Sequence, residues 1–188
     1  MTAPIDWTPK ARAVLAAASE LFYEHGIHAV GVDTIAERAG VTKKTLYDRF
    51  GSKERLVVEY LSARDSEWRQ FLAAHLEQAG RTPHEQLRAV FSASAAWSQD
   101  RGRKGCSMIN AYAEISDPRH PAHAVIVGQK RWMLTLFTDL AEAAGVAEPR
   151  LVADRIMLLH EGALVTAGMG IVDDAFAHAA ACAAALLA

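Results

Sequence analysis

The sequence contains too little cysteine for a disulfide framework and no apolar run long enough to span a membrane. Its two cysteines, Cys106 and Cys182, lie far apart and have no metal-ligand spacing, which suits a reducing compartment. The apolar run at residues 13–18 follows two cations, as in a signal peptide, but ends too early to serve as one. No later run reaches the roughly 18–20 apolar residues of a membrane span. We therefore expect a soluble, cytoplasmic protein with no membrane partner.

The chain also lacks an overall excess of positive charge, because 20 Lys and Arg stand against 22 Asp and Glu. This balance alone does not indicate a protein that binds nucleic acid. Residues 43–53 are the exception, since four cations there stand against one aspartate. Any affinity for DNA should come from this segment and should fall as the salt concentration rises.

Residue patterns that support catalysis are missing. The sequence has no G-x-S-x-G segment and no phosphate-binding glycine loop, and His160-Glu161 lacks the second histidine of a metalloprotease helix. Cys106 has no evident base partner. Two histidine pairs have short spacings but no third ligand nearby, namely His25 with His28 and His120 with His123. We expect neither an enzyme nor a metal or cofactor site.

Residues 32–50 predict a helix-turn-helix, two short helices joined by a tight turn. The first helix has a small apolar face, made of Val32, Ile35, Ala36 and Ala39. Gly40 follows, where a helix end commonly needs a residue that can adopt positive φ. Thr42 can then cap a second helix. Its apolar anchors, Leu46 and Phe50, are four residues apart and therefore lie on the same side.

The second helix of this hairpin has a polar outer face. At 100° per residue, Lys44 and Asp48 point away from the apolar anchors. Thr45 and Tyr47 lie on the two flanks. These four side chains are expected to face outward, as residues of a DNA recognition helix do. An ordinary helical hairpin without a role in DNA binding is the alternative.

Further helices flank the hairpin. Thr8 and Pro9 favour a helix start, and Gly26 favours its end. After the hairpin, Ser52 can cap a long helix. Lys53 stands in the first turn of that helix, where a cation is unfavourable for the helix dipole but would suit a DNA phosphate. A solvated lysine is the alternative.

The rest of the chain predicts helices and no strands, so the expected fold class is all-α. The expected helices cover residues 53–80, 83–100, 106–116, about 120–144, 148 to about 168 or 170, and a last segment from about 173. The basic segment R-G-R-K-G at 101–105 predicts a solvated loop.

The last of these helices has an alanine-rich face. Its members are Phe176, Ala179, Ala180, Ala183, Ala184 and Leu187. Small residues permit close contact between helices but supply little burial to a helix that lies alone on a core, so the last two helices favour a subunit interface. Packing against the chain's own domain is the alternative.

The segment A-G-V-T-K-K-T-L-Y-D-R-F at 39–50, followed by S-K-E-R-L at 52–56, resembles TetR-type transcriptional regulators. The likeness is strong for residues 10–57 and weaker beyond, although G-C-S-M-I-N-A-Y-A-E at 105–114 also resembles one branch of that family. The resemblance implies a three-helix DNA-binding domain at residues 1–52 and a helical effector-binding and dimerisation domain at 53–188. It further implies a homodimer that pairs through its last two helices and acts as a repressor.

The resemblance also implies which residues contact double-stranded operator DNA. They are Thr34, Thr42, Lys43, Lys44, Thr45, Tyr47 and Asp48, with Lys53 as a phosphate contact. Gly31 stands where many members place a threonine that caps a helix and touches phosphate, so this contact is either absent or made by Thr34. Asp48 replaces a frequent histidine, and its carboxylate would repel phosphate but could accept a hydrogen bond from cytosine N4.

A small apolar or amphipathic effector that releases the repressor from DNA is a further implication of the resemblance. Candidate effector contacts are Trp68, Phe71, Trp97, Met108, Tyr112, Trp132, Met157 and His160. Each of them also fits an ordinary helical core, since Met and aromatic residues at helical spacing are common there. A DNA-binding dimer without any effector is the alternative function.

Overall fold

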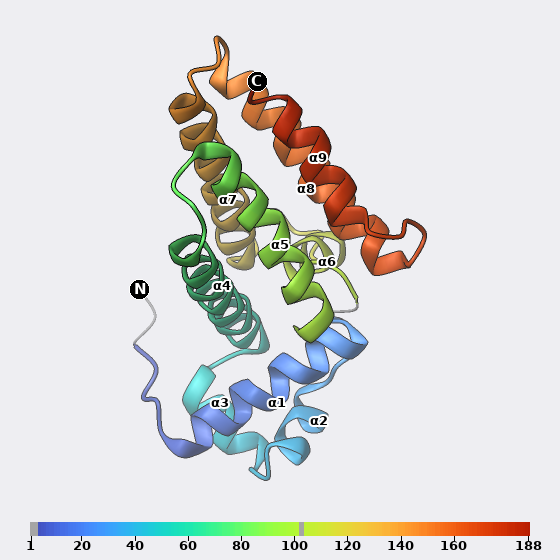
Figure 1. The fold of residues 1–188 in the computed structure, drawn as a ribbon. Coiled ribbons are helices and arrows are strands. Elements are labelled where there is room, and N and C mark those ends of the chain that lie inside the picture. The colour runs from blue at the N-terminus through green and yellow to red at the C-terminus, as the bar shows by residue number, and fades with distance from the viewer. Residues whose placement is uncertain (1–3, 102–103) are drawn as a thin grey trace. The chain divides into compact units, whose positions relative to one another are not determined.

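The computed structural model describes residues 4–101 and 104–188, and these residues form helices and no strands (Figure 1). The helices are α1 (Pro9–His25), α2 (Val32–Arg38), α3 (Lys43–Phe50), α4 (Lys53–Gln78), α5 (Pro83–Arg101), α6 (Ser107–Glu114), α7 (Ala122–Ala144), α8 (Pro149–Met169) and α9 (Ala175–Ala185). The predicted all-α fold class is therefore confirmed. Residues 102 and 103 of the predicted 101–105 loop lie outside the described residues.

The helix starts follow the predicted capping residues. The Thr8 hydroxyl accepts a hydrogen bond from the Ala11 N–H at the start of α1, and Gly26 ends that helix at a φ of 90°. Ser52 Oγ accepts the Arg55 N–H at 3.1 Å and so caps α4. Within the described residues, none of the helices is both long and apolar enough to cross a membrane.

Contacts divide the chain into two compact units. The N-terminal unit runs to Arg64 and also includes Ser107–Ile126, and the second unit contains the described residues of Asp65–Cys106 and Val127–Ala188. The expected domain boundary after residue 52 does not coincide with this division. The start of α4 and the whole of α6 pack with the N-terminal helices, and no local sequence pattern carries that information.

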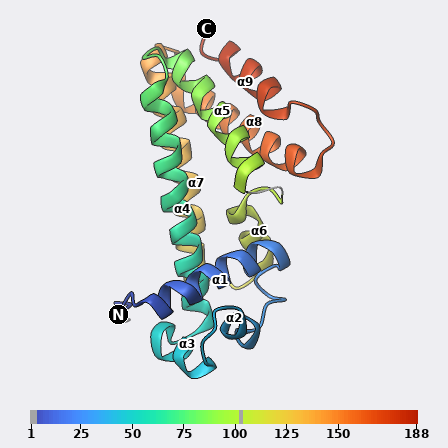
Figure 2. The ribbon, with the colours of Figure 1, turned by 60° about the horizontal axis from the view of Figure 1, so that its bottom comes forward.

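In the N-terminal unit, α1, α2 and α3 pack against one another, as Figure 2 shows. Their contacting faces are apolar and buried. The buried side chains include Val14, Ala18, Phe22, Ile35, Ala36, Leu46 and Phe50. Burial of the last two residues confirms the predicted anchors of the second hairpin helix.

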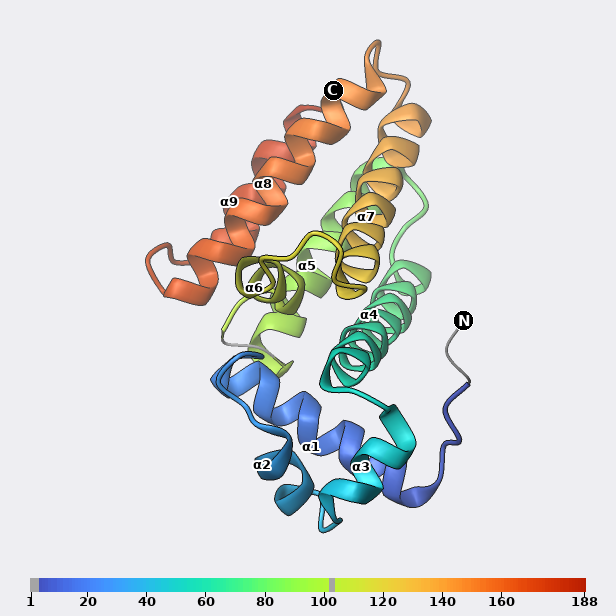
Figure 3. The ribbon, with the colours of Figure 1, turned by 180° about the vertical axis from the view of Figure 1, so that it is seen from behind.

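The second unit has its own apolar core, to which α5, α8 and α9 contribute. Figure 3 shows α8 and α9 side by side, and α9 also packs against α5. The core includes Phe91 of α5, Phe137 of α7 and Ile156 of α8, all almost fully buried. Trp68 of α4 donates its indole N–H to Met133 Sδ of α7 at 3.5 Å.

Most of the alanine-rich face of α9 is buried within the chain, so this particular face is not available to a partner subunit. Phe176, Ala179, Ala183 and Leu187 are buried in the core of the second unit. Ala180 is half-buried and packs against this core, and Ala184 is also half-buried. The small side chains let α9 approach α5 and α8 of the same chain, which was the alternative reading of the sequence.

Candidate DNA-binding surface

A tight turn joins α2 to α3. The N–H of Gly40 donates to Glu37 O and that of Val41 donates to Ala36 O, which together satisfy carbonyls at the end of α2. Gly40 adopts a φ of 65°, a left-handed conformation that costs a residue with a Cβ about 1–2 kcal/mol. The prediction that Gly40 ends the first helix of the hairpin is thereby confirmed.

The first turn of α3 is fixed by Thr42. Its side chain accepts the Thr45 N–H at 3.1 Å, and the two hydroxyls lie 2.9 Å apart. The predicted N-cap is confirmed. α2 begins differently, because Gly31 at its N-cap position supplies no side-chain hydrogen bond.

The outer face of α3 is exposed as the helical spacing predicts. Lys44, Tyr47 and Asp48 face solvent, and Thr45 is half-buried on the flank. Tyr47 leaves 41% of its surface exposed although it is a large aromatic residue. Of the other predicted contacts, Thr34, Thr42 and Lys43 are also exposed. A rigid helix thus presents polar and aromatic groups while Leu46 and Phe50 hold its opposite side.

Two cations of α3 form ion pairs that the sequence did not reveal. Lys43 Nζ donates to Asp33 Oδ2 of α2 at 2.9 Å. The hydrogen bond to Asp33, and then its charge, raise the pKa of Lys43 above the ordinary value. Arg49 Nη1 donates to Asp6 Oδ2 at 2.7 Å, and Trp7 contacts Phe50 edge-on. The segment before α1 therefore packs against the end of α3.

Lys53, the predicted phosphate contact, lies beside a carboxylate of α6. Its amine is 5.9 Å from the centre of the Phe22 ring, and burial lowers its pKa while the charge of Glu114 opposes that shift. Glu114 Oε2 also accepts the His28 N–H at 2.9 Å. Glu114 therefore holds the loop after α1 and stands near the start of α4. Its role was not predicted, because 86 residues separate it from His28.

Comparisons with known proteins agree on one family. Residues 14–60 match the family described as bacterial regulatory proteins, tetR family. The fold resembles a putative TetR transcriptional regulator from Streptomyces avermitilis, at 30% identity, 88% coverage of both chains and a TM-score of 0.76. This chain belongs to the TetR family.

A second TetR-family regulator, from Streptomyces coelicolor, is 28% identical, covers 94% of this chain and 95% of its own, and has a TM-score of 0.86. The transcriptional activator FasR of Mycolicibacterium smegmatis is 52% identical over 48 residues, which span 26% of this chain but only 22% of FasR. The TetR relatives are transcriptional regulators and not enzymes, in agreement with the expected lack of catalytic function.

Six of the candidate effector contacts lie in the second unit of this TetR protein, and five of them belong to its apolar core or pack against it. Trp68, Phe71 and Trp97 contact one another through their rings. The Arg69 guanidinium lies over the Trp132 ring, with 4.1 Å between Arg69 Cζ and the centre of the ring. Met157 packs against the core of the unit. His160 is buried and its Nε2 lies 2.9 Å from Ser94 Oγ.

The other two candidates, Met108 and Tyr112, lie on α6 in the N-terminal unit. Met108 is buried, whereas Tyr112 is 60% exposed and contacts the His123 ring edge-on. A hollow of about 510 Å³ lies elsewhere, and none of the eight candidates lines it. Its lining residues are Leu76, Glu77, Ala79, Arg81 and Gln86.

A polar cluster that the sequence did not predict lies in the second unit. Lys130 Nζ donates to both oxygens of Glu161 at 2.9 Å and lies 3.4 Å from Cys106 Sγ. Burial lowers the pKa of Lys130, but Cys106 and Glu161 outweigh it and the net shift is upward. Among the described residues, no three Cys, His, Asp or Glu side chains lie together as metal ligands would.

Proposed function

We propose that this TetR-family protein binds operator DNA as a homodimer and represses transcription from it. The observation that supports the proposal best is the outer face of α3, where Lys44, Tyr47 and Asp48 are exposed on a helix whose other side is buried. A recognition helix of a helix-turn-helix protein enters the major groove and contacts base edges from such a face.

In the proposed complex, each α3 lies in one of two successive major grooves about 34–36 Å apart. Lys44 and Tyr47 contact bases or neighbouring phosphates, and Asp48 accepts a hydrogen bond from cytosine N4. The remaining contacts are made to the edge of the groove and to phosphates. They come from Thr34, Thr42, Lys43, Thr45 and Lys53.

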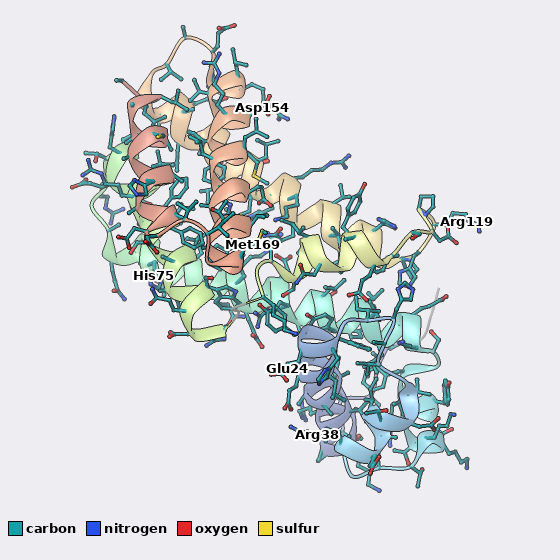
Figure 4. The ribbon with its side chains drawn as sticks, turned by 90° about the vertical axis from the view of Figure 1, so that its right-hand side faces the viewer. Glu24, Arg38, His75, Arg119, Asp154 and Met169 are labelled. Atoms are coloured by element: carbon teal, nitrogen blue, oxygen red, sulfur yellow. The ribbon has the colours of Figure 1, made fainter. Side chains whose placement is uncertain are left out.

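The proposed homodimer forms through α8 and α9. The support is a set of exposed apolar residues on α8 that are seven or four positions apart, and therefore near one face of the helix, and that the core does not use. Its large members are Leu151, Leu158, Val165 and Met169, with Leu158 74% and Met169 67% exposed. Figure 4 labels Met169 and Asp154 towards opposite ends of α8. Exposed apolar surface of this kind marks an interaction site in many proteins.

Release from the operator by a small apolar or amphipathic effector completes the proposal. An effector shifts the equilibrium between the DNA-binding conformation and a second conformation only as far as its affinities for the two conformations differ. The rival function is a DNA-binding dimer whose second unit serves dimerisation or protein contacts alone. Thermal unfolding with a set of small apolar compounds separates the two, because a tight ligand raises the melting temperature by mass action.

The test of DNA binding uses an operator selected from random duplexes by the purified protein. Lys44→Glu and Tyr47→Ala should each weaken binding to that operator by about tenfold or more while the protein stays folded and dimeric. Arg131→Glu is the control, since it makes the same charge change at an exposed position of α7. Wild-type affinity in both α3 variants would contradict the proposed face. A reporter gene under the same operator gives the sign of regulation.

A further inference from the structure

Two of the three cations on α3 already have carboxylate partners elsewhere in the chain. Asp33 binds Lys43 and Asp6 binds Arg49, at 2.9 and 2.7 Å. Both carboxylates are largely solvent-exposed, with 75% and 73% of their side-chain surface accessible. Among the described residues, Lys44 has no recorded ion pair of this kind. Lys44 is thus available, whereas Lys43 at the start of α3 and Arg49 near its end are each paired with a carboxylate.

The two pairs have the geometry of weak, exchangeable contacts. Each rests on one recorded hydrogen bond, and the Arg49 guanidinium uses a single nitrogen rather than a bidentate fork. Exposed pairs of this type contribute little, because water and salt screen them. A DNA phosphate can therefore replace either carboxylate as the partner of its cation. The displaced carboxylate nevertheless remains tethered within the same surface and repels phosphates.

We propose that Asp33 and Asp6 compete with DNA phosphates for Lys43 and Arg49, and so lower operator affinity and its dependence on salt. The inference rests on the proposed DNA-binding function of α3. Each cation that is paired internally releases fewer counterions when DNA binds than a free cation does. The protein would thereby hold its affinity low enough for other signals to control it.

A carboxylate that orients its cation toward a base edge would have the opposite effect. Its removal would weaken binding, relax sequence preference and leave the dependence on salt unchanged or reduced. The exposure of both pairs argues against that role, because orientation by a carboxylate needs a partner held in one geometry.

The test compares wild type with Asp33→Asn, Asp6→Asn and the double variant, each titrated against the selected operator at several KCl concentrations. Each single variant should bind about three- to tenfold more tightly at about 0.1 M salt. The slope of log Kobs against log salt should steepen by about one for each freed cation. Asp33→Asn should give a smaller gain in a Lys43→Gln background, since the cation it frees is missing and only the repulsion of phosphates by the carboxylate is removed.

Glu67→Gln on α4 is the matched control, because it removes the same charge from another exposed ion pair, that with Arg101, and should change neither affinity nor slope. Circular dichroism checks that each variant is folded, and the two sites provide independent tests. Unchanged or weaker binding by both aspartate variants, with wild type still binding, overturns this inference alone. Failure of wild type to select or bind any operator overturns the proposed function instead.

Discussion

Lys44 and Tyr47 owe their exposure to two residues that are buried beneath them. Leu46 and Phe50 are 0% and 2% exposed, and they hold α3 in one rotation about its axis. Because the residues on the outer face do not pack against the core, they can be substituted without unfolding the protein. Functional specificity and stability are therefore carried by different residues of the same eight-residue helix.

His160 shows the reverse case, a titratable residue that serves stability. Burial lowers the pKa of His160 below its ordinary value of 6.5. Burial raises the pKa of the neighbouring Glu161, but His160 and Lys130 outweigh this effect and the net shift of Glu161 is downward. His160 therefore binds a proton more readily in the unfolded chain than in the folded chain. Stability from the neutral imidazole is present above pH 6.5 and is lost as the pH falls below it.

We expect the urea midpoint of the wild-type protein to fall between about pH 7.5 and about pH 5.5. His160→Gln should lower the midpoint at the higher pH, because it disturbs packing on Phe91 and Phe137, and should flatten its dependence on pH. His178→Gln on the exposed side of α9 is the control and should leave that dependence intact. An equal pH response in wild type and His160→Gln would contradict the assignment.

Local sequence patterns predicted the residues that shape the candidate site but not the partners of those residues. Thr42 and Gly40 act through neighbours three to five positions away, so their roles follow from capping rules. The partner of Arg49 is 43 residues away in the chain, and the carboxylate beside Lys53 comes from α6. No periodicity links such residues, because only tertiary packing brings them together.

At the scale of elements, α8 and α9 differ in the apolar surface they expose, although the sequence predicted a subunit interface through both helices. The alanine face of α9 is used within the chain, where small side chains allow close packing on α5 and α8. The large exposed apolar residues belong to α8 instead. Composition alone did not distinguish these helices, since both have apolar residues at helical spacing on more than one side.

Leu158→Glu should weaken the proposed dimer by about 100-fold or more, because a buried unpaired carboxylate in a helix interface is costly. Sedimentation equilibrium of the purified protein measures the change. Gln70→Glu adds the same charge at an exposed position of α4 and should leave the dimer unaffected. A Leu158→Glu protein that remains dimeric at wild-type affinity would exclude α8 as the interface.

At the scale of the whole molecule, the two compact units share continuous helices. α4 and α7 each contribute residues to both units, and α6 returns to the N-terminal unit after the chain has passed through the second. The expected division at residue 52 missed this, since a boundary drawn in sequence cannot show a segment that returns.

The central claim is that the protein binds operator DNA as a symmetric homodimer, in which the outer face of each α3 contacts the bases. A structure of the protein bound to its selected operator tests it most directly. We expect the α3 helices of two copies in successive major grooves, about 34–36 Å apart, with Lys44 and Tyr47 against the DNA. A complex in which α3 faces solvent, or in which another surface contacts the duplex, would contradict the claim.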